Sequence, residues 1–384
     1  MKLSIKYKIL LLTFFVVLVT SLWSNNIYLL FAFSILCWIT IPQKKWWDGM
    51  SISLFIFSIF YGLMLIINGK VNSIANLFSY MIAPVAFYRF GRQSMKIFKE
   101  DNLRQKFLIF SILLYLGYFL LLIFKDIGIV GIVNTTRVLL GDIGNDHALS
   151  ATLYGLMASI GIGCIAAIFV KKENFWIRLG FIILALLSML CVIHLVNRTG
   201  LVVLVICLAI SFFISTRFNA SKMVGRLFIL LMLGFLVIQI GLVDQSVLDA
   251  YAQREENSAY DASSLGGRSD IWLSAIGSLF TSPFGWEPVG YTFAHNMWLD
   301  IARMAGLLAF IPFLIATILH GKNLLKLFRN RYITNFTAII ISINVAMLLS
   351  SFVEPVIEGS LLFFCILMMI WGITKSLAME NKLK

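Results

Sequence analysis

Residues 177–216 read IRLGFIILALLSMLCVIHLVNRTGLVVLVICLAISFFIST, which is two apolar runs joined by a short polar turn. The runs, 177–195 and 200–216, are each long enough to cross the apolar core of a bilayer as a helix. Backbone amides find no water inside a bilayer, so they must be satisfied within the segment itself. The stretch therefore predicts a helical hairpin in a membrane.

Apolar runs of this kind recur along all 384 residues. Hydrophobic residues make up 60% of the chain and charged residues 13%, whereas soluble domains carry about 25% charged residues. We predict an all-α polytopic membrane protein, a single integral membrane domain over 1–384, with about twelve transmembrane helices. The expected spans are 9–22, 27–41, 50–67, 74–88, 107–124, 148–170, 177–195, 200–216, 227–243, 305–320, 333–351 and 359–374.

The distribution of positive charge predicts the orientation. With a cytoplasmic N-terminus, seven of the 31 lysines and arginines face outward and the other 24 face the cytoplasm. The seven are Lys70, Lys125, Arg137, Arg198, Arg254, Arg268 and Arg303. By the positive-inside rule both termini are cytoplasmic, and the first span is expected to be a retained signal anchor. The net charge of +13 then reflects topology, so we predict no nucleic-acid partner.

The cysteines and the motif content of the sequence bear on bound metals and cofactors. All five cysteines fall in predicted spans, where they behave as small apolar residues. No metal-ligand spacing and no phosphate-binding glycine loop is found, so we predict no metal and no cofactor. The basic run 89–106 is expected to be a cytoplasmic loop that contacts anionic lipid headgroups.

The exterior segment 244–304 is the longest predicted loop. After Gly266 and Gly267 it continues as RSDIWLSAIGSLF from Arg268, with apolar residues on one face of a helix. That face consists of Ile271, Trp272, Ala275, Ile276, Leu279 and Phe280. We expect this helix to lie on the membrane surface, and the turn 283–290 to return the chain toward the bilayer.

Arginine is favoured over lysine on the exterior side, five to two, although lysine predominates inside. A guanidinium binds phosphate oxygens bidentately, which an ammonium cannot do. Arg198 closes a short turn between spans, and Arg268 begins the surface helix. Either could simply snorkel to the interface. With His295 on the same side, however, they suggest a site where arginines hold a lipid-linked diphosphate and the imidazole acts as general base. His194 is interpreted as structural.

Three stretches carry a resemblance to a known family. LVNRTGLVVL, SLGGRSDIWLSAIGSLFTSPFGWEPVG and AHNMWLDIARMAGLLAFIPFL resemble the O-antigen ligase/polymerase family over roughly residues 137–315. Arg198, Arg268 and His295 match that family's two arginines and its histidine in order. The resemblance implies a glycosyltransferase that uses an undecaprenyl-diphosphate-linked glycan on the periplasmic face of the bacterial inner membrane.

The resemblance also implies further residues and partners. TTRVLLGDIGNDHALSATLYG is similar to an earlier loop of the family, which makes Arg137 a candidate for substrate binding, together with Asn296 and Arg303. The expected partners are the lipid-linked oligosaccharide, a glycan or lipid A-core acceptor, membrane lipids and a chain-length regulator. Only 27 residues separate Arg268 from His295, which favours a polymerase over a ligase.

Some alternatives remain open at this stage. A flippase or transporter of the same lipid-linked oligosaccharide would require charged residues within the spans, and the sequence places almost all charges in loops. Asp300, five residues after His295, is not expected to orient the imidazole. Glu354 and Glu358 are interpreted as exposed charges at the rim of the last exterior loop.

Overall fold

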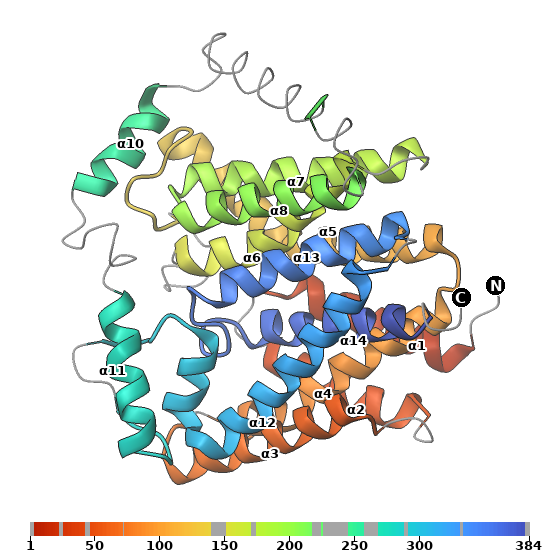
Figure 1. Cartoon of the computed structure of the whole chain (residues 1–384), viewed down its shortest axis with the longest axis vertical. Helices are drawn as coiled ribbons and strands as arrows, with labels where there is room; N and C mark the ends of the chain where they lie inside the picture. The colour runs from red at the N-terminus through yellow and green to blue at the C-terminus, as the bar shows by residue number, and fades with distance from the viewer. Residues whose placement is uncertain are drawn as a thin grey trace. The chain divides into compact units, whose positions relative to one another are not determined.

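The computed structural model describes residues 4–22, 26–42, 47–71, 73–139, 151–169, 174–216, 224–225, 245–256, 268–287, 291–330 and 333–380. Every element in these ranges is a helix (Figure 1), which confirms the predicted all-α, membrane-embedded fold. Seven of the described helices are long and apolar enough to cross a bilayer. They are α3 (Gly49–Ile67), α5 (Asp101–Val130), α6 with η2 (Ala151–Ile168), α7 (Phe175–His194), α8 (Arg198–Thr216), α12 (Met297–Phe328) and α14 (Leu361–Glu380).

Further helices coincide with several other predicted spans. α2 (Asn26–Thr40) and α13 (Asn335–Ser351) are shorter apolar helices. α1 (Ile5–Val19) overlaps most of the first predicted span, and α4 (Ile74–Ile97) covers the fourth. The predicted span 227–243 lies outside the described residues. The count of twelve therefore stays a prediction.

Polar side chains start several of these helices. Asp48 accepts a hydrogen bond from the amide of Ser51 at the start of α3, and Ser73 accepts one from the amide of Asn76 at the start of α4. Such caps satisfy amides that have no partner within the helix. The same signal, an Asn at position 296, begins α12 in the candidate site.

The chain forms two compact units. The first comprises residues 1–118, 268–332 and 351–384. In it α4 packs along α14, and α3 along α12. Gly91 and Gly372 permit the close approach of α4 and α14, because a Cβ atom at either position would lie within about 2.0 Å of a carbonyl oxygen of the other helix. Small residues serve this purpose in membrane helices generally.

The second unit comprises residues 119–267 and 333–350. Its helices are the end of α5, α6, η2, α7, α8, α10 (Gln245–Glu256) and α13. α6 packs against α7 and α8, and a Cβ atom on Gly163 would lie 2.5 Å from the Cα atom of Ile343 in α13. This unit carries Arg137 and Arg198.

The basic run 89–106 differs from its prediction. α4 continues through the first half of the run, and α5 begins before it ends. Arg92 pairs with Asp48 at 2.8 Å and Arg104 with Glu380 at 2.7 Å, while Arg89 is buried between two tryptophan rings. The prediction of a loop on lipid headgroups was wrong for these three arginines, because each guanidinium is engaged inside the first unit.

α12 also departs from the predicted span 305–320. It begins at Met297 and ends at Phe328, with a break at Gly306, whose φ is +66°. The segment 282–287 packs into this break: the amide of Leu307 donates to the carbonyl of Pro283 at 2.7 Å, and the amide of Trp286 donates to the carbonyl of Arg303 at 3.0 Å. The inserted segment accounts for the kink.

Candidate active site around His295

His295 lies in a tight turn immediately before α12. Its φ is +51°, a left-handed conformation that is unfavourable for a residue with a Cβ atom. Asp300 holds the turn, because its Oδ1 accepts from the amide of Ala294 at 2.7 Å and its Oδ2 from the amide of Asn296 at 3.2 Å. Asp300 was not expected to orient the imidazole, and its hydrogen bonds are with the backbone amides on either side of His295 and not with the ring. The sequence argument did not anticipate this backbone contact, because it assumed one continuous helix, whereas His295 precedes α12.

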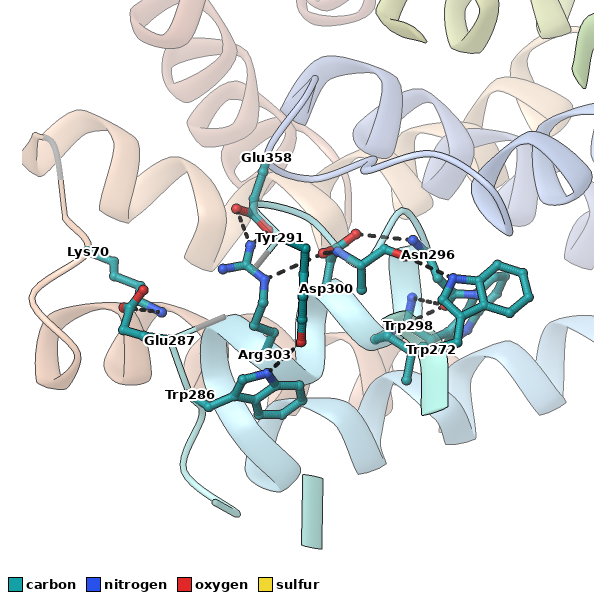
Figure 2. Close-up of polar contacts among 12 residues, drawn as sticks. Lys70, Trp272, Trp286, Glu287, Tyr291, Asn296, Trp298, Asp300, Arg303 and Glu358 are labelled. Carbon is teal, nitrogen blue, oxygen red and sulfur yellow. Dashed lines mark hydrogen bonds and ion pairs between the residues drawn. The ribbon is translucent and has the colours of Figure 1, made fainter. Parts of the chain in front are cut away.

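Two further residues attach this turn to neighbouring segments. The Asn296 side chain caps α12 by accepting from the amides of Trp298 and Leu299, and its Nδ2 donates to the carbonyl of Phe352 at 3.2 Å. The indole of Trp272, in α11 (Arg268–Thr281), donates to the carbonyl of Ala294 at 2.8 Å. Figure 2 shows the Asn296 and Trp272 side chains close together beside the start of α12. Three separate segments therefore fix the turn.

Glu354 brings Arg268 and His295 to a common point. One carboxylate oxygen lies 3.8 Å from a guanidinium nitrogen of Arg268, and the other lies 3.9 Å from Nδ1 of His295. The interpretation of Glu354 as an exposed rim charge was wrong, since only 4% of the residue is exposed. Little in the sequence indicates that Glu354 is buried, because burial of this loop depends on contacts with segments more than fifty residues away.

Two polar atoms in this cluster have unused hydrogen-bonding capacity. Nδ1 of His295 and Oε2 of Glu354 are both buried, and neither has a hydrogen-bond partner among the described residues. They face each other at 3.9 Å, which is beyond hydrogen-bond length. Hydrogen bonds between catalytic groups often shorten only when substrate binds.

Arg303 is also engaged, although it was expected to bind substrate. Its side chain is 5% exposed; Nη2 bonds both carboxylate oxygens of Glu358, and Nε lies 3.5 Å from Asp300 (Figure 2). Burial raises the pKa of the Glu358 carboxyl, and the Arg303 guanidinium acts in the opposite direction. Glu358 is therefore not a rim charge, and the geometry gives Arg303 a positioning contact with the His295 turn.

The surface helix that begins at Arg268 differs in part from its predicted face. Ala275 and Leu279 are buried, and Ile271 and Trp272 pack against a cluster formed by Ala275, Ala294 and Leu299. Other apolar residues of this region are exposed. They are Leu273, Ile276, Phe280 and Phe284. The predicted single face is thus divided between the protein interior and the surface, and its interior half positions Trp272 on the His295 turn.

Arg198 and Arg137 belong to the second unit. Arg198 is the first residue of α8, and its buried Nη2 has no hydrogen-bond partner among the described residues. The carbonyl of Arg137, a residue with φ of +59°, accepts from the amide of Ala151 at 3.0 Å. The carbonyl of Ala151 in turn accepts from the side chain of Asn197 at 3.2 Å. The segments carrying the two arginines are therefore connected through one residue of α6.

A buried histidine supports the same part of the second unit. Nε2 of His194 lies 2.8 Å from Asp126, and Nδ1 lies 2.9 Å from the carbonyl of Ile132. The side chains of His194 and Asp126 are both fully buried. Asn134 donates to Asp126 at 2.6 Å and accepts from the amide of Arg137 at 3.1 Å. His194 is buried as expected, and the pair anchors the Arg137 turn.

No protein-family model matches the chain, and no curated protein matches it. Within the described residues, no group of three or more histidine, cysteine, aspartate or glutamate side chains is placed to hold a metal ion. The function is therefore inferred from the geometry and chemistry around His295.

Proposed function

We propose that the protein is a glycosyltransferase of the bacterial inner membrane that uses an undecaprenyl-diphosphate-linked glycan as donor. It extends O-antigen or another surface polysaccharide by adding repeat units on the periplasmic side. The observation that carries this proposal is the convergence of Arg268, His295 and buried Glu354, within 3.8–3.9 Å. Together they supply a phosphate-binding fork and a base with a carboxylate beside it.

The proposed transfer assigns a step to each group. The acceptor hydroxyl oxygen attacks the anomeric carbon of the donor glycan, and the bond from that carbon to the diphosphate breaks. Undecaprenyl diphosphate leaves with the bonding electrons, and Arg268 stabilises its charge at the start of α11, where the helix dipole also favours an anion. His295 accepts the hydroxyl proton, and Glu354 stabilises the resulting imidazolium. Arg198 and Arg137, which lie in the second unit, stay candidate diphosphate ligands on the sequence resemblance alone.

The test is transfer by the purified protein in lipid nanodiscs. The substrate is the lipid-linked repeat unit extracted from a source strain that lacks this gene. A ladder of longer glycans on undecaprenyl diphosphate is expected for a polymerase. Product that forms only when lipid A-core is added would identify a ligase instead. The absence of any covalent product with either acceptor would refute glycosyl transfer.

Transport of the same lipid-linked oligosaccharide is the second candidate. Three charged residues favour this candidate, although the sequence places almost all charges in loops: Asp126 lies in α5, and Asp300 and Arg303 lie in α12, both of which are long and apolar enough to span a membrane. These charges are buried: Asp126 pairs with His194, Arg303 pairs with Glu358, and Asp300 lies 3.5 Å from Arg303. Transporters also hold intramembrane charges in pairs. Movement of intact lipid-linked oligosaccharide across vesicles, without covalent product, would favour this candidate.

A further inference from the structure

Three charged residues connect the segments that carry His295 and Glu354. We infer that Asp300, Arg303 and Glu358 form a positioning clamp that fixes the imidazole of His295 relative to the Glu354 carboxylate. This inference rests on the proposed function, because it assigns the clamp to the same site. None of the three acts on the reacting atoms; each acts through the two groups that do.

The first part of the clamp is the pair of hydrogen bonds between Asp300 and the backbone. Its two oxygens accept from the amides on either side of His295, at 2.7 and 3.2 Å. A carboxylate accepts at both oxygens, whereas an asparagine amide offers one acceptor and one donor. Without two acceptors, a histidine at φ +51° would relax toward the ordinary region, and its imidazole would turn away from Glu354.

The second part joins Asp300 to the loop between α13 and α14. The Arg303 guanidinium lies between Asp300 and Glu358 (Figure 2), and its planar fork suits two carboxylates in fixed directions. Glu358 stands four residues after Glu354 in this loop. Arg303 therefore transmits the position of the His295 turn to the segment that presents Glu354.

A second attachment lies on the other side of Glu354. Asn296, adjacent to His295, donates to the carbonyl of Phe352. Glu354 is thus held between two bonds to the same structural unit, one at residue 352 and one at residue 358. Two attachments fix both the distance of the Glu354 side chain from His295 and its direction. A single ion pair that only stabilised the fold would need one attachment.

The experiment measures the position of His295 without relying on transfer activity. Wild-type protein and the variants Asp300→Asn and Glu358→Gln are treated in nanodiscs with diethylpyrocarbonate, and acylation of His295 is followed by mass spectrometry. Glu287→Gln is the matched control, since Glu287 is 79% exposed and pairs with Lys70 at 3.0 Å, away from the turn. We expect both clamp variants to change the His295 acylation rate several-fold and the control to match wild type. Unchanged acylation in folded clamp variants would overturn the inference.

Kinetics separate positioning from general stability. A displacement of about 1 Å can cost about 10²-fold in rate, so we expect kcat to fall by about 10- to 100-fold in each clamp variant with little change in donor KM. Equal kcat in folded variant and wild type would contradict the clamp. If wild-type protein shows no transfer, the proposed function fails, while the acylation result still decides whether the clamp positions His295.

A charge exchange distinguishes a clamp from an isolated ion pair. The double variant Arg303→Glu/Glu358→Arg keeps an ion pair between positions 303 and 358 with the two charges exchanged. The carboxylate introduced at position 303 then lies beside the carboxylate of Asp300. We expect acylation of His295 to remain abnormal and activity to remain low. Should the exchange restore wild-type behaviour, Arg303 and Glu358 would form a simple pair independent of Asp300, and the clamp would be rejected. If Asp300→Asn does not fold, Arg303→Lys is measured in its place, with the same expected change.

Discussion

Replacement of Glu354 is the sharpest test of the site, because this residue contacts both proposed functional groups. In Glu354→Gln the side chain keeps its size and loses its charge. At 3.9 Å from His295 Nδ1, the attraction between a carboxylate and an imidazolium is about 4 kcal/mol at an effective dielectric constant of about 20. This attraction is absent for a neutral imidazole and develops as His295 takes the proton. Glu354 therefore stabilises the transition state more than the ground state.

The expected loss is smaller than the full attraction. The His295 side chain is 32% exposed, so solvent screens part of the interaction, and a glutamine dipole replaces another part. If about 2–3 kcal/mol is lost, kcat falls by about 10²-fold. Donor KM should stay constant or fall, because Arg268 loses a competing carboxylate at 3.8 Å and becomes more available to diphosphate.

The assay is initial-rate transfer by purified protein over a range of donor concentrations, and Glu287→Gln is again the control for loss of one carboxylate. An increase of donor KM at constant kcat in Glu354→Gln would refute the reasoning. It would mean that Glu354 organises binding and does not support the base.

Three further predictions concern other parts of the molecule. Arg268→Ala should reduce turnover by about 10²–10³-fold, the scale for one preorganised donor to developing charge, and Arg268→Lys should restore only part of it; full activity of the lysine variant would show that the fork geometry is irrelevant. In a variant without the five native cysteines, Thr292→Cys should react with an impermeant thiol reagent in intact cells, and Glu100→Cys should not. The reverse labelling pattern would place His295 on the cytoplasmic side. Asp126→Ala should reduce the free energy of unfolding by about 3–5 kcal/mol, because it leaves fully buried His194 without its charged partner; an unchanged denaturation curve would remove the anchoring role of this pair.

The helical membrane fold was predictable because it depends on local composition. Apolar runs longer than about 17 residues dictate helices wherever a bilayer is the solvent, and the hairpin 177–216 appears as α7 and α8 with the turn at Leu195–Asn197. Helix ends were less predictable. α12 begins eight residues before its expected span because Asn296 caps it, although Asp300 and Arg303 made that segment look like a loop.

The candidate site was only partly predictable, because its assembly depends on contacts between distant segments. Arg268 and His295 could be chosen as candidate site residues from their residue type and their position in the sequence. The role of Glu354 could not, because its burial arises from packing of the last exterior loop against segments distant in sequence. The contact of Asp300 with the backbone around His295 was not anticipated for a related reason: it depends on one left-handed residue, and a helical-wheel argument does not predict that conformation.

The unused hydrogen-bonding capacity at the site also bears on function. A buried polar atom without a partner costs about 1–3 kcal/mol, so the chain would gain stability if Nδ1 of His295 and Oε2 of Glu354 moved about 1 Å closer. The attachments through Asp300 and Asn296 hold the two atoms at their separation. The left-handed conformation of His295 is a second unfavourable feature at the same place. Such strain persists only where the surrounding structure enforces it, and it concentrates at sites that act on a ligand. A purely structural turn would be more stable with a hydrogen bond between His295 and Glu354. The two unfavourable features therefore favour a catalytic role for this turn.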